Sequence, residues 1–301
     1  MRGIPKSPGR WMWPGDFGCI LNDGYKILPA RRPPDDNSER KKDTMMLSKV
    51  GTLKGYKLRS FDGEIGKVEE FYFDDRYWTM RYLIADTGDW LTGRQVLLSP
   101  YALRVVNQEK QYITVALTKK QIEDSPSLNT DKPVSRQFED EYYDYYGWSP
   151  YWAGSYAWGT YEDIVHDREV SREAIQSAKN WNPNLRSTHD MRGHHIQATD
   201  GVIGHVDDFI VDDATWTIRY LVVNTHNWWP GKKVLVSPKW IERVSWDDRK
   251  VFVNLSCETI KLAPEYTNET VLTRDYETRL HGYYNLQGYW ADEETAREHS
   301  R

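Results

Sequence analysis

One internal repeat dominates this sequence of 301 residues. Residues separated by 138 positions match, and roughly 33 of the 106 positions from Leu47 to Trp152 are identical to their counterparts from Leu185 to Trp290. The alignment needs no gap. A period of this length is far above the roughly 20–50 residues of solenoid repeats. The chain is therefore expected to fold as two copies of one domain.

The repeat divides the chain into five segments. A proline-rich stretch without hydrophobic periodicity precedes it, and a short charged end follows it; we expect both to be disordered. The linker between the copies begins rich in aromatic residues and glycine and then becomes charged. The predicted segments are a disordered extension over 1–46, the first repeat with its tail over 47–152, the linker over 153–184, the second repeat with its tail over 185–290, and a disordered end over 291–301.

Composition argues against several classes of protein. Lys and Arg number 40 against 45 Asp and Glu, which gives a net charge of -5, whereas a strong nucleic-acid binder carries a basic surplus. The sequence contains no run of about 18 apolar residues, so we predict no transmembrane segment and expect a cytoplasmic protein. Cys19 and Cys257 are too few for a disulfide framework or a cysteine-based metal site.

Hydrophobic residues within each copy alternate with a period of two, which is typical of strands. We expect four such residues to share one face of a strand in each copy: Trp78, Met80, Tyr82 and Ile84 in the first, and Trp216, Ile218, Tyr220 and Val222 in the second. Asp-Gly pairs predict tight hairpin turns at Asp62-Gly63 and Asp200-Gly201, and a second hairpin is expected at Asp74–Tyr77. About six short strands in roughly 70 residues favour a small barrel or sandwich. A short helix is predicted over Thr118–Asp124.

The tail of each copy changes to the period of a helix. Ser135 and Thr273 are suitable N-caps. Apolar residues then recur at i, i+4, i+7 and i+8, which makes one face of a helix: Phe138, Tyr142, Tyr145 and Tyr146 in the first tail, and Tyr276, Leu280, Tyr283 and Tyr284 in the second. Such a tyrosine-rich face is expected to dock on a barrel, either its own or that of the other copy.

An ordered set of residues common to both copies resembles the PRC-barrel family. The set is Asp-Gly-x-Ile-Gly-x-Val, then Phe-x-x-Asp-Asp, Trp-Thr-x-Arg-Tyr-Leu, Val-Leu and Ser-Pro, and it covers about 53–126 and 191–264. The family takes its name from the photosynthetic reaction centre H subunit, and a related barrel forms the C-terminal half of the ribosome-maturation factor RimM. The resemblance implies an all-β-dominated fold of two small antiparallel β-barrels. Each barrel is followed by a short helix and a tyrosine-rich helical tail, and we expect the barrels to pack as a pseudo-dimer.

The resemblance implies protein docking and no catalytic residue. We expect a non-enzymatic docking or scaffolding module that binds an unknown protein partner and uses no cofactor and no metal. The sequence contains no nucleophile elbow, phosphate-binding glycine loop, His-Glu-x-x-His or Cys-x-x-Cys motif. Three alternatives remain open: a photosynthesis- or electron-transfer-associated factor like the reaction centre subunit, a ribosome-assembly factor, and an enzyme that uses the repeated Asp residues.

Aromatic residues in loops and tails are the candidates for partner binding, because such side chains often anchor interfaces. Trp90 and the pair Trp228-Trp229 precede a Val-Leu strand and could alternatively fold over the mouth of a barrel. The full set of candidates is Trp90, Trp228, Trp229, Tyr145, Tyr146, Trp152, Tyr283, Tyr284 and Trp290.

Repeated acidic residues have both a structural and a functional interpretation. They could form a cation site or an acid–base pair, but Asp at a hairpin turn also bonds to its own backbone, and we favour this turn chemistry. The residues are Asp62, Asp74, Asp75, Asp200, Asp212 and Asp213.

Basic residues and histidines raise the same choice. Arg81 and Arg219 could bind an anionic partner, but pairing across a hairpin with Glu69 or Glu70, and with Asp207 or Asp208, is the favoured interpretation. A metal site in the second copy would need His189, His194, His195 and His205, although adjacent His194 and His195 point to opposite faces of a strand.

Overall fold

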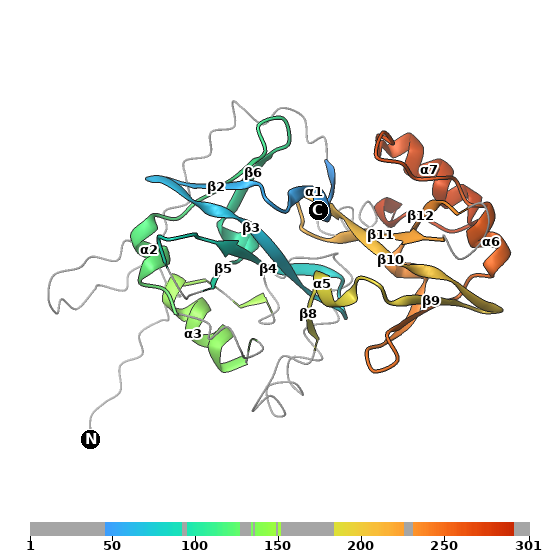
Figure 1. Ribbon diagram of the computed structural model, residues 1–301, viewed down its shortest axis with the longest axis horizontal. Helices are drawn as coiled ribbons and strands as arrows, with labels where there is room; N and C mark the ends of the chain where they lie inside the picture. Colours follow the sequence, from blue (N-terminus) through green and yellow to red (C-terminus); the bar gives the residue numbers. More distant parts are fainter. Residues whose placement is uncertain are drawn as a thin grey trace, which may run out of the picture. The chain divides into compact units, whose positions relative to one another are not determined.

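Strands and short helices follow the same order in both repeats of the computed structural model (Figure 1). The structure describes residues 46–91, 95–126, 134, 136–148, 150–151, 184–225 and 231–291. The two ends predicted to be disordered and nearly all of the linker lie outside these ranges, as does Ser135.

The first repeat forms a sheet of short strands around one long hairpin. The strand order is β5-β4-β3-β2-β7-β6, and every pairing is antiparallel except β2 with β7. The elements are β1 (Leu47–Lys49), α1 (Val50–Leu53), β2 (Lys57–Ser60), β3 (Gly63–Asp74), β4 (Thr79–Asp86), β5 (Val96–Leu98), the 3-10 turn η1 (Pro100–Ala102), β6 (Leu103–Asn107), β7 (Tyr112–Val115), α2 (Lys119–Glu123) and the tail helix α3 (Arg136–Tyr146).

The second repeat reproduces this order as β12-β11-β10-β9-β14-β13, with β9 and β14 parallel. Its elements are β8 (Leu185–Ser187), α5 (Thr188–Met191), β9 (His195–Ala198), β10 (Gly201–Asp212), β11 (Ile218–Asn224), β12 (Lys233–Val236), η3 (Pro238–Trp240), β13 (Ile241–Ser245), β14 (Lys250–Val253), α6 (Cys257–Leu262) and α7 (Arg274–Tyr283). Among the described residues, no pairing joins the two end strands of either order. The prediction of two β-dominated units with short helices is confirmed.

A β-bulge overturns the predicted alternation in β4. The register with β3 shifts between Tyr82 and Met80, so that Arg81 is the extra residue. As a result Met80 faces the main core, whereas Tyr82 and Ile84 lie in a second core cluster beneath the tail. The prediction that Met80, Tyr82 and Ile84 share one face was therefore wrong, because one inserted residue reverses the side on which the following residues lie. The same shift occurs at Arg219 in β11.

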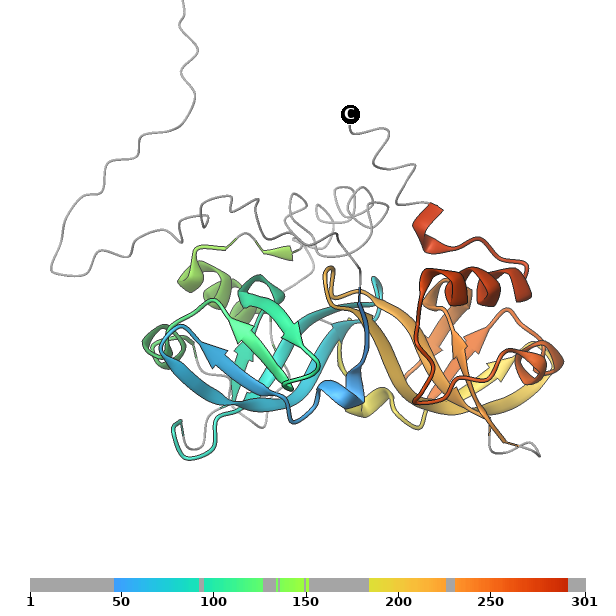
Figure 2. The ribbon, with the colours of Figure 1, turned by 90° about the horizontal axis from the view of Figure 1, so that it is seen from above.

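Each tail helix packs on the sheet of its own repeat (Figure 2). In the first repeat the Tyr142 hydroxyl donates a hydrogen bond to the Leu97 carbonyl at 3.1 Å. In the second, the side chain of Thr273 caps α7 by accepting a hydrogen bond from the Tyr276 amide, as predicted. The structure thus selects the first of the two docking arrangements left open by the sequence.

The first strand of each repeat belongs to the sheet of the other repeat. β1 pairs with β10, and β8 pairs with β3. The registers are equivalent, because Leu47 lies opposite Asp212 and Leu185 lies opposite Asp74. Each sheet is therefore completed by three residues from the other repeat, and the two copies are bound to each other by strand exchange.

The two β-hairpins β3–β4 and β10–β11 meet at a point of local twofold symmetry. Thr79 forms an antiparallel bridge with Thr217, its own counterpart in the repeat. The Met80 amide donates to the Trp216 carbonyl at 2.8 Å, and the Ile218 amide donates to the Trp78 carbonyl at 2.7 Å. Both Trp residues have φ near +50°, at 52° and 56°. This conformation is strained for a bulky side chain, and the reciprocal hydrogen bonds of their carbonyls help to hold it.

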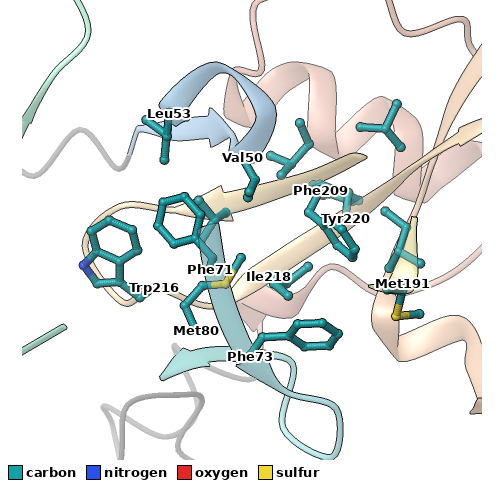
Figure 3. Packing of buried hydrophobic residues seen from close by; sticks show 14 of the residues in the cluster. Val50, Leu53, Phe71, Phe73, Met80, Met191, Phe209, Trp216, Ile218 and Tyr220 are labelled. Atoms are coloured by element: carbon teal, nitrogen blue, oxygen red, sulfur yellow. The ribbon is translucent and has the colours of Figure 1, made fainter. Parts of the chain in front are cut away.

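One hydrophobic core runs through this junction (Figure 3). The rings of Phe71 and Trp216 stack with centroids 6.1 Å apart, and the ring centroids of Phe73 and Phe209 are 5.8 Å apart. From the exchanged segment, Val50 is fully buried in the same core. Since these side chains come from both repeats, burying them also holds the two copies together.

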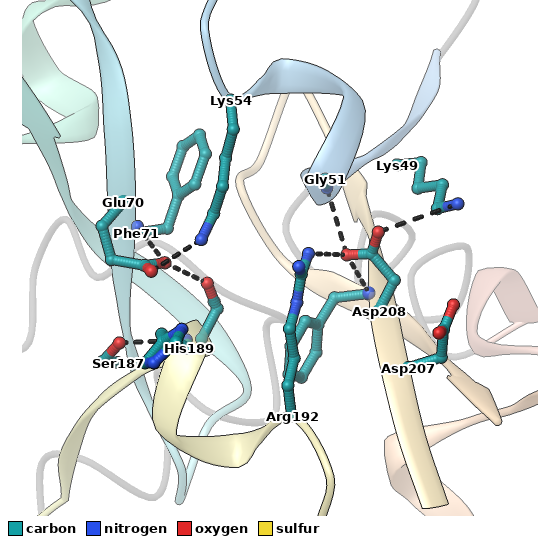
Figure 4. A network of polar contacts seen from close by, with 12 residues as sticks. Lys49, Gly51, Lys54, Glu70, Phe71, Ser187, His189, Arg192, Asp207 and Asp208 are labelled. Atoms are coloured by element: carbon teal, nitrogen blue, oxygen red, sulfur yellow. Dashed lines mark hydrogen bonds and ion pairs between the residues drawn. The ribbon is translucent and has the colours of Figure 1, made fainter. Parts of the chain in front are cut away.

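Two carboxylates, the buried Asp208 and the partly buried Glu70, fasten the exchanged helices (Figure 4). Asp208 accepts a hydrogen bond from the Gly51 amide of α1 at 3.1 Å and pairs with Arg192 at 2.7 Å. Glu70, at the equivalent position, accepts a hydrogen bond from the Thr188 hydroxyl of α5 and pairs with Lys54 at 2.6 Å. Each carboxylate thus links a cation of its own repeat to a helix of the other.

The substitution Gly51→Ala tests this fastening. A Cβ atom at Gly51 would lie 2.2 Å from the carboxylate of Asp208. The carboxylate must then move and lose the amide hydrogen bond, so we expect the free energy of unfolding in urea to fall by about 1–3 kcal/mol. The control is Gly282→Ala, at an exposed helical position with no atom within 4 Å of the added Cβ. It should raise stability by about 0.5–1 kcal/mol, and a similar result for both variants would contradict the fastening role of Asp208.

Candidate functional site

Each repeat contains a buried carboxylate–arginine pair at the end of its long hairpin. Arg219 donates to the fully buried Asp212 at 2.9 Å, and its guanidinium stacks over the Tyr289 ring at 3.9 Å from the centroid. In the first repeat Arg81 lies 3.8 Å from Asp74 and 4.1 Å from the centroid of Tyr151.

The predicted pairing of these arginines with Glu69 or Glu70, and with Asp207 or Asp208, was wrong. The bulge places each arginine at the turn of its hairpin, next to Asp74 or Asp212. Both Asp side chains also accept hydrogen bonds from backbone amides of the turn, such as the Ala214 amide at 2.9 Å. These contacts match the predicted turn chemistry.

A second buried carboxylate in each repeat holds the tail, and the sequence did not lead us to it. Glu139 accepts hydrogen bonds from the hydroxyls of Tyr82 and Tyr151, both at 2.9 Å. Glu277 accepts the equivalent hydrogen bonds from Tyr220 and Tyr289, both at 2.8 Å. Burial raises the pKa of Glu277 above its ordinary value.

A signal for these residues was present in the sequence. Glu139 and Glu277 are identical at the offset of 138, and each lies beside the tyrosine-rich face of its helix. Each carboxylate accepts hydrogen bonds from one tyrosine of the sheet and from one tyrosine beyond the helix, and it therefore anchors the tail to the sheet.

The Asp residues of the first hairpin turns cap the short helices that follow each sheet. Asp62 accepts a hydrogen bond from the Lys119 amide at 2.9 Å, and Asp200 accepts one from the Cys257 amide at 2.7 Å. These amides begin α2 and α6. Both carboxylates thus satisfy amides that a helix terminus leaves unpaired.

Asp75 and Asp213 occupy equivalent positions but have different surroundings. Asp75 accepts a hydrogen bond from the Trp246 indole at 2.7 Å and pairs with Arg186 at 3.3 Å. Asp213 accepts a hydrogen bond from the Met46 amide at 3.3 Å. Burial, followed by the charge of Asp212, raises the pKa of Asp213 to about 6.

The histidines of the second repeat do not converge. His194 is buried with its ring edge-on to Trp246 at 5.1 Å, whereas His195 is exposed on β9. Burial lowers the pKa of His194, which favours the neutral ring. Within the described part of the chain, no three His, Cys, Asp or Glu side chains are placed to hold a metal ion together.

The aromatic candidates for partner binding occupy different environments. Trp90 is half-buried with the Lys119 ammonium 5.5 Å from its ring centroid. Tyr146 stacks on Trp148 at 4.4 Å, and Tyr284 is buried against Trp240. Three candidates, Trp152, Trp228 and Trp229, lie outside the described residues.

The remaining candidates belong to the ends of the tails. Tyr145 and Tyr283 each donate a hydrogen bond to a carbonyl of the short helix beside them, at 2.9 and 2.8 Å. Trp290 is half-buried with its ring 5.0 Å from that of His281. Tyr283 keeps 39% of its surface exposed. The structure adds two exposed apolar residues that the sequence did not suggest: Leu262, the last residue of α6, 64% exposed, and Leu286, three residues after Tyr283, 39% exposed. We call Leu262, Tyr283 and Leu286 the α6–α7 patch.

The family model of the PRC-barrel domain matches residues 47–122 and 183–257. The chain belongs to the PRC-barrel family. No curated protein matches it. Each matched segment of this PRC-barrel protein begins at its exchanged strand or two residues before it, so the family domain includes the strand that the structure places in the other sheet. Within the described residues, no helix has the length and apolar character needed to cross a membrane.

Removing one member of a buried pair tests its structural role. Arg219→Met leaves the carboxylate of Asp212 buried without its cation. We expect a loss of about 3–5 kcal/mol in the free energy of unfolding, measured in urea. Arg279→Met removes an exposed arginine of α7 and should change stability by no more than about 0.5 kcal/mol. A loss below about 1 kcal/mol for Arg219→Met would show that the pair does little for the fold.

The raised pKa of Asp213 predicts a dependence of stability on pH. A carboxyl whose pKa is higher in the folded state binds its proton more tightly there, so its ionisation disfavours folding. Stability should therefore decrease as pH rises from 3.8, the ordinary value, through about 6. We expect Asp213→Asn to remove roughly 1–2 kcal/mol of this decrease, allowing for partial exposure. The free energy of unfolding in urea is measured for both proteins at pH 4 and at pH 7. If its change between the two pH values is the same in both proteins, the raised pKa of Asp213 is refuted.

Proposed function

We propose that this PRC-barrel protein is a non-enzymatic docking or scaffolding module that binds a protein partner through the α6–α7 patch. The observation that carries the proposal is the exposure of three apolar side chains on, or just after, two helices that the Tyr283 hydroxyl joins. The Tyr283 hydroxyl bonds to the Thr259 carbonyl, one helical turn before Leu262, and Leu286 follows the end of α7. Grouped apolar surface of this kind is typical of interaction sites.

Comparison with the first repeat supports this assignment. The positions equivalent to Leu262 and Leu286 are Asp124 and Trp148. Asp124 is charged, and Trp148 stacks on Tyr101 with ring centroids 5.6 Å apart. The first repeat thus covers its own aromatic side chain at this place, whereas the second leaves its apolar side chains exposed.

The buried carboxylates support a structural role for the groups that an enzyme would use. Asp74 and Asp212 are engaged by arginine and by turn amides, and Glu277 is enclosed by tyrosine hydroxyls. General acid–base catalysis requires a titratable group within hydrogen-bonding reach of a substrate. The repeated Asp residues are better explained as parts of the fold.

Site-specific cross-linking tests the docking face. A photoreactive amino acid at Tyr283, in the full chain expressed in its native cell, should yield a discrete cross-linked protein. The same group at Phe61 serves as the control, because Phe61 is 75% exposed and lies on the β2–β3 hairpin of the other repeat. The substitutions Leu262→Ser and Leu286→Ser together should abolish the product while leaving the fold, followed by circular dichroism, unchanged.

Two results would contradict the proposal. One is the absence of a discrete product at Tyr283; the other is the same product from Tyr283 and Phe61, since this would report chance encounter. Partner capture that survives both serine substitutions would place the docking surface elsewhere.

A further inference from the structure

A cleft of about 730 Å³ opens where the β3–β4 turn of the first repeat meets the second repeat. One wall is the turn Asp75–Trp78 between β3 and β4, and the other is formed by η3 and β13. Its size is within the range of pockets that bind small molecules, and junctions between structural units are common places for such pockets. The cleft is separate from the α6–α7 patch and has no part in the proposed docking role.

The cleft has a surplus of positive charge. Arg76, Lys239 and Arg243 all line it and are exposed. Of its two acidic residues, Asp75 is already engaged by Arg186 and Trp246, which leaves Glu242. Within the described residues, no ion pair joins Arg76 or Arg243 to a carboxylate. This cationic surface lies on a chain whose net charge is -5.

Aromatic rings orient the arginines. The Arg243 guanidinium lies 3.5 Å from the centroid of Phe252, and that of Arg76 lies 5.3 Å from the centroid of Tyr77. A stacked guanidinium still directs N–H groups outward in its plane, and this planar fork suits the oxygen atoms of a phosphate.

The repeat provides an internal comparison for the cleft. The positions equivalent to Arg76, Lys239 and Arg243 are Ala214, Tyr101 and Val105. None of these is charged. Residues that hold the fold, such as the arginine–aspartate pairs, are the same in both copies. The cationic residues differ between the copies, so the symmetric fold does not account for them.

The cleft also has a surface for a planar ring. Trp78, which is only partly buried, lines it, and Asn184 adds a polar group. Aromatic side chains of this kind stack on flat heterocycles, with a gain of about 1–3 kcal/mol per base in nucleic-acid complexes.

We propose that this cleft binds a small phosphorylated ligand with a planar ring, of the size of a nucleoside diphosphate. Arg76, Lys239 and Arg243 contact the phosphate oxygens. Trp78 contacts the ring.

Titration calorimetry of the full chain with ADP and with pyrophosphate tests this assignment. We expect saturable binding of both probes, with ADP the tighter by about tenfold or more because only ADP offers a ring. The substitutions Lys239→Gln and Arg243→Gln together should weaken both affinities by about tenfold or more. The matched control is Lys110→Gln with Arg279→Gln, which removes one exposed lysine and one exposed arginine outside the cleft and should leave both affinities unchanged.

Three outcomes would overturn the proposal. They are the absence of saturable binding of either probe at millimolar concentration, equal weakening by the cleft and control substitutions, and equal affinities for ADP and pyrophosphate. The last would remove the ring from the assignment. The cleft substitutions should not alter the Tyr283 cross-link, so failure of this proposal and failure of the docking proposal can be told apart.

Discussion

The backbone junction between Thr79 and Thr217 is the contact on which the rest of this structure depends. Two equivalent hairpins can share such a bridge only if they are related by twofold symmetry at that point. Once this relation is fixed, the first strand of each repeat lies alongside the long strand of the other, as the registers of β1 and β8 show. Strand exchange, the shared core and the reciprocal carboxylates all follow from the same geometry. Each copy therefore depends on the other for a complete sheet.

Exchange also explains why polar residues are buried at the junction. The short helix α1 begins without a side-chain cap of its own, and its amide at Gly51 must find an acceptor in the other repeat. Asp208 supplies it, and the carboxylate is in turn compensated by Arg192. A buried charge of this kind adds little stability by itself, but it disfavours arrangements in which the exchanged helix lies elsewhere. The hydrophobic contact of Phe71 with Trp216 provides attraction, and the carboxylates restrict the geometry.

Much of the fold could be predicted from the sequence, because short-range signals determine it. The turn at Asp74–Tyr77 and the cap at Thr273 are local patterns, and the structure contains both. The repeat at an offset of 138 is found by comparing the sequence with itself, and both copies have the same order of elements. The exchange of β1 could not be predicted in this way. Leu47–Lys49 has the same pattern whichever sheet it joins, and the choice depends on contacts more than 150 residues away, such as that of Gly51 with Asp208.

The residues of the candidate site also divide into those that a local pattern predicts and those that depend on distant contacts. Glu139 escaped prediction because a carboxylate beside a tyrosine-rich helical face normally indicates a solvent-exposed position, and only the three-dimensional fold brings Tyr82 and Tyr151 to it. The bulge at Arg81 was equally invisible, since one extra residue leaves no mark on composition and yet reverses the face of the strand that follows.

Because the chain contains two copies of one domain, a comparison of equivalent positions distinguishes residues that the fold requires from residues that it does not. Two copies that exchange strands must keep the residues on which the exchange relies, and the arginine–aspartate pairs and the Trp carbonyl junction are present in both. Positions that face solvent are free of this constraint, so the copies can diverge there without loss of the fold. Leu262 and Leu286 of the α6–α7 patch are such diverged positions, as are the cations Arg76, Lys239 and Arg243 of the cleft. In this protein residues common to both copies account for the fold, and the diverged apolar and charged residues give the patch and the cleft their distinct chemistry.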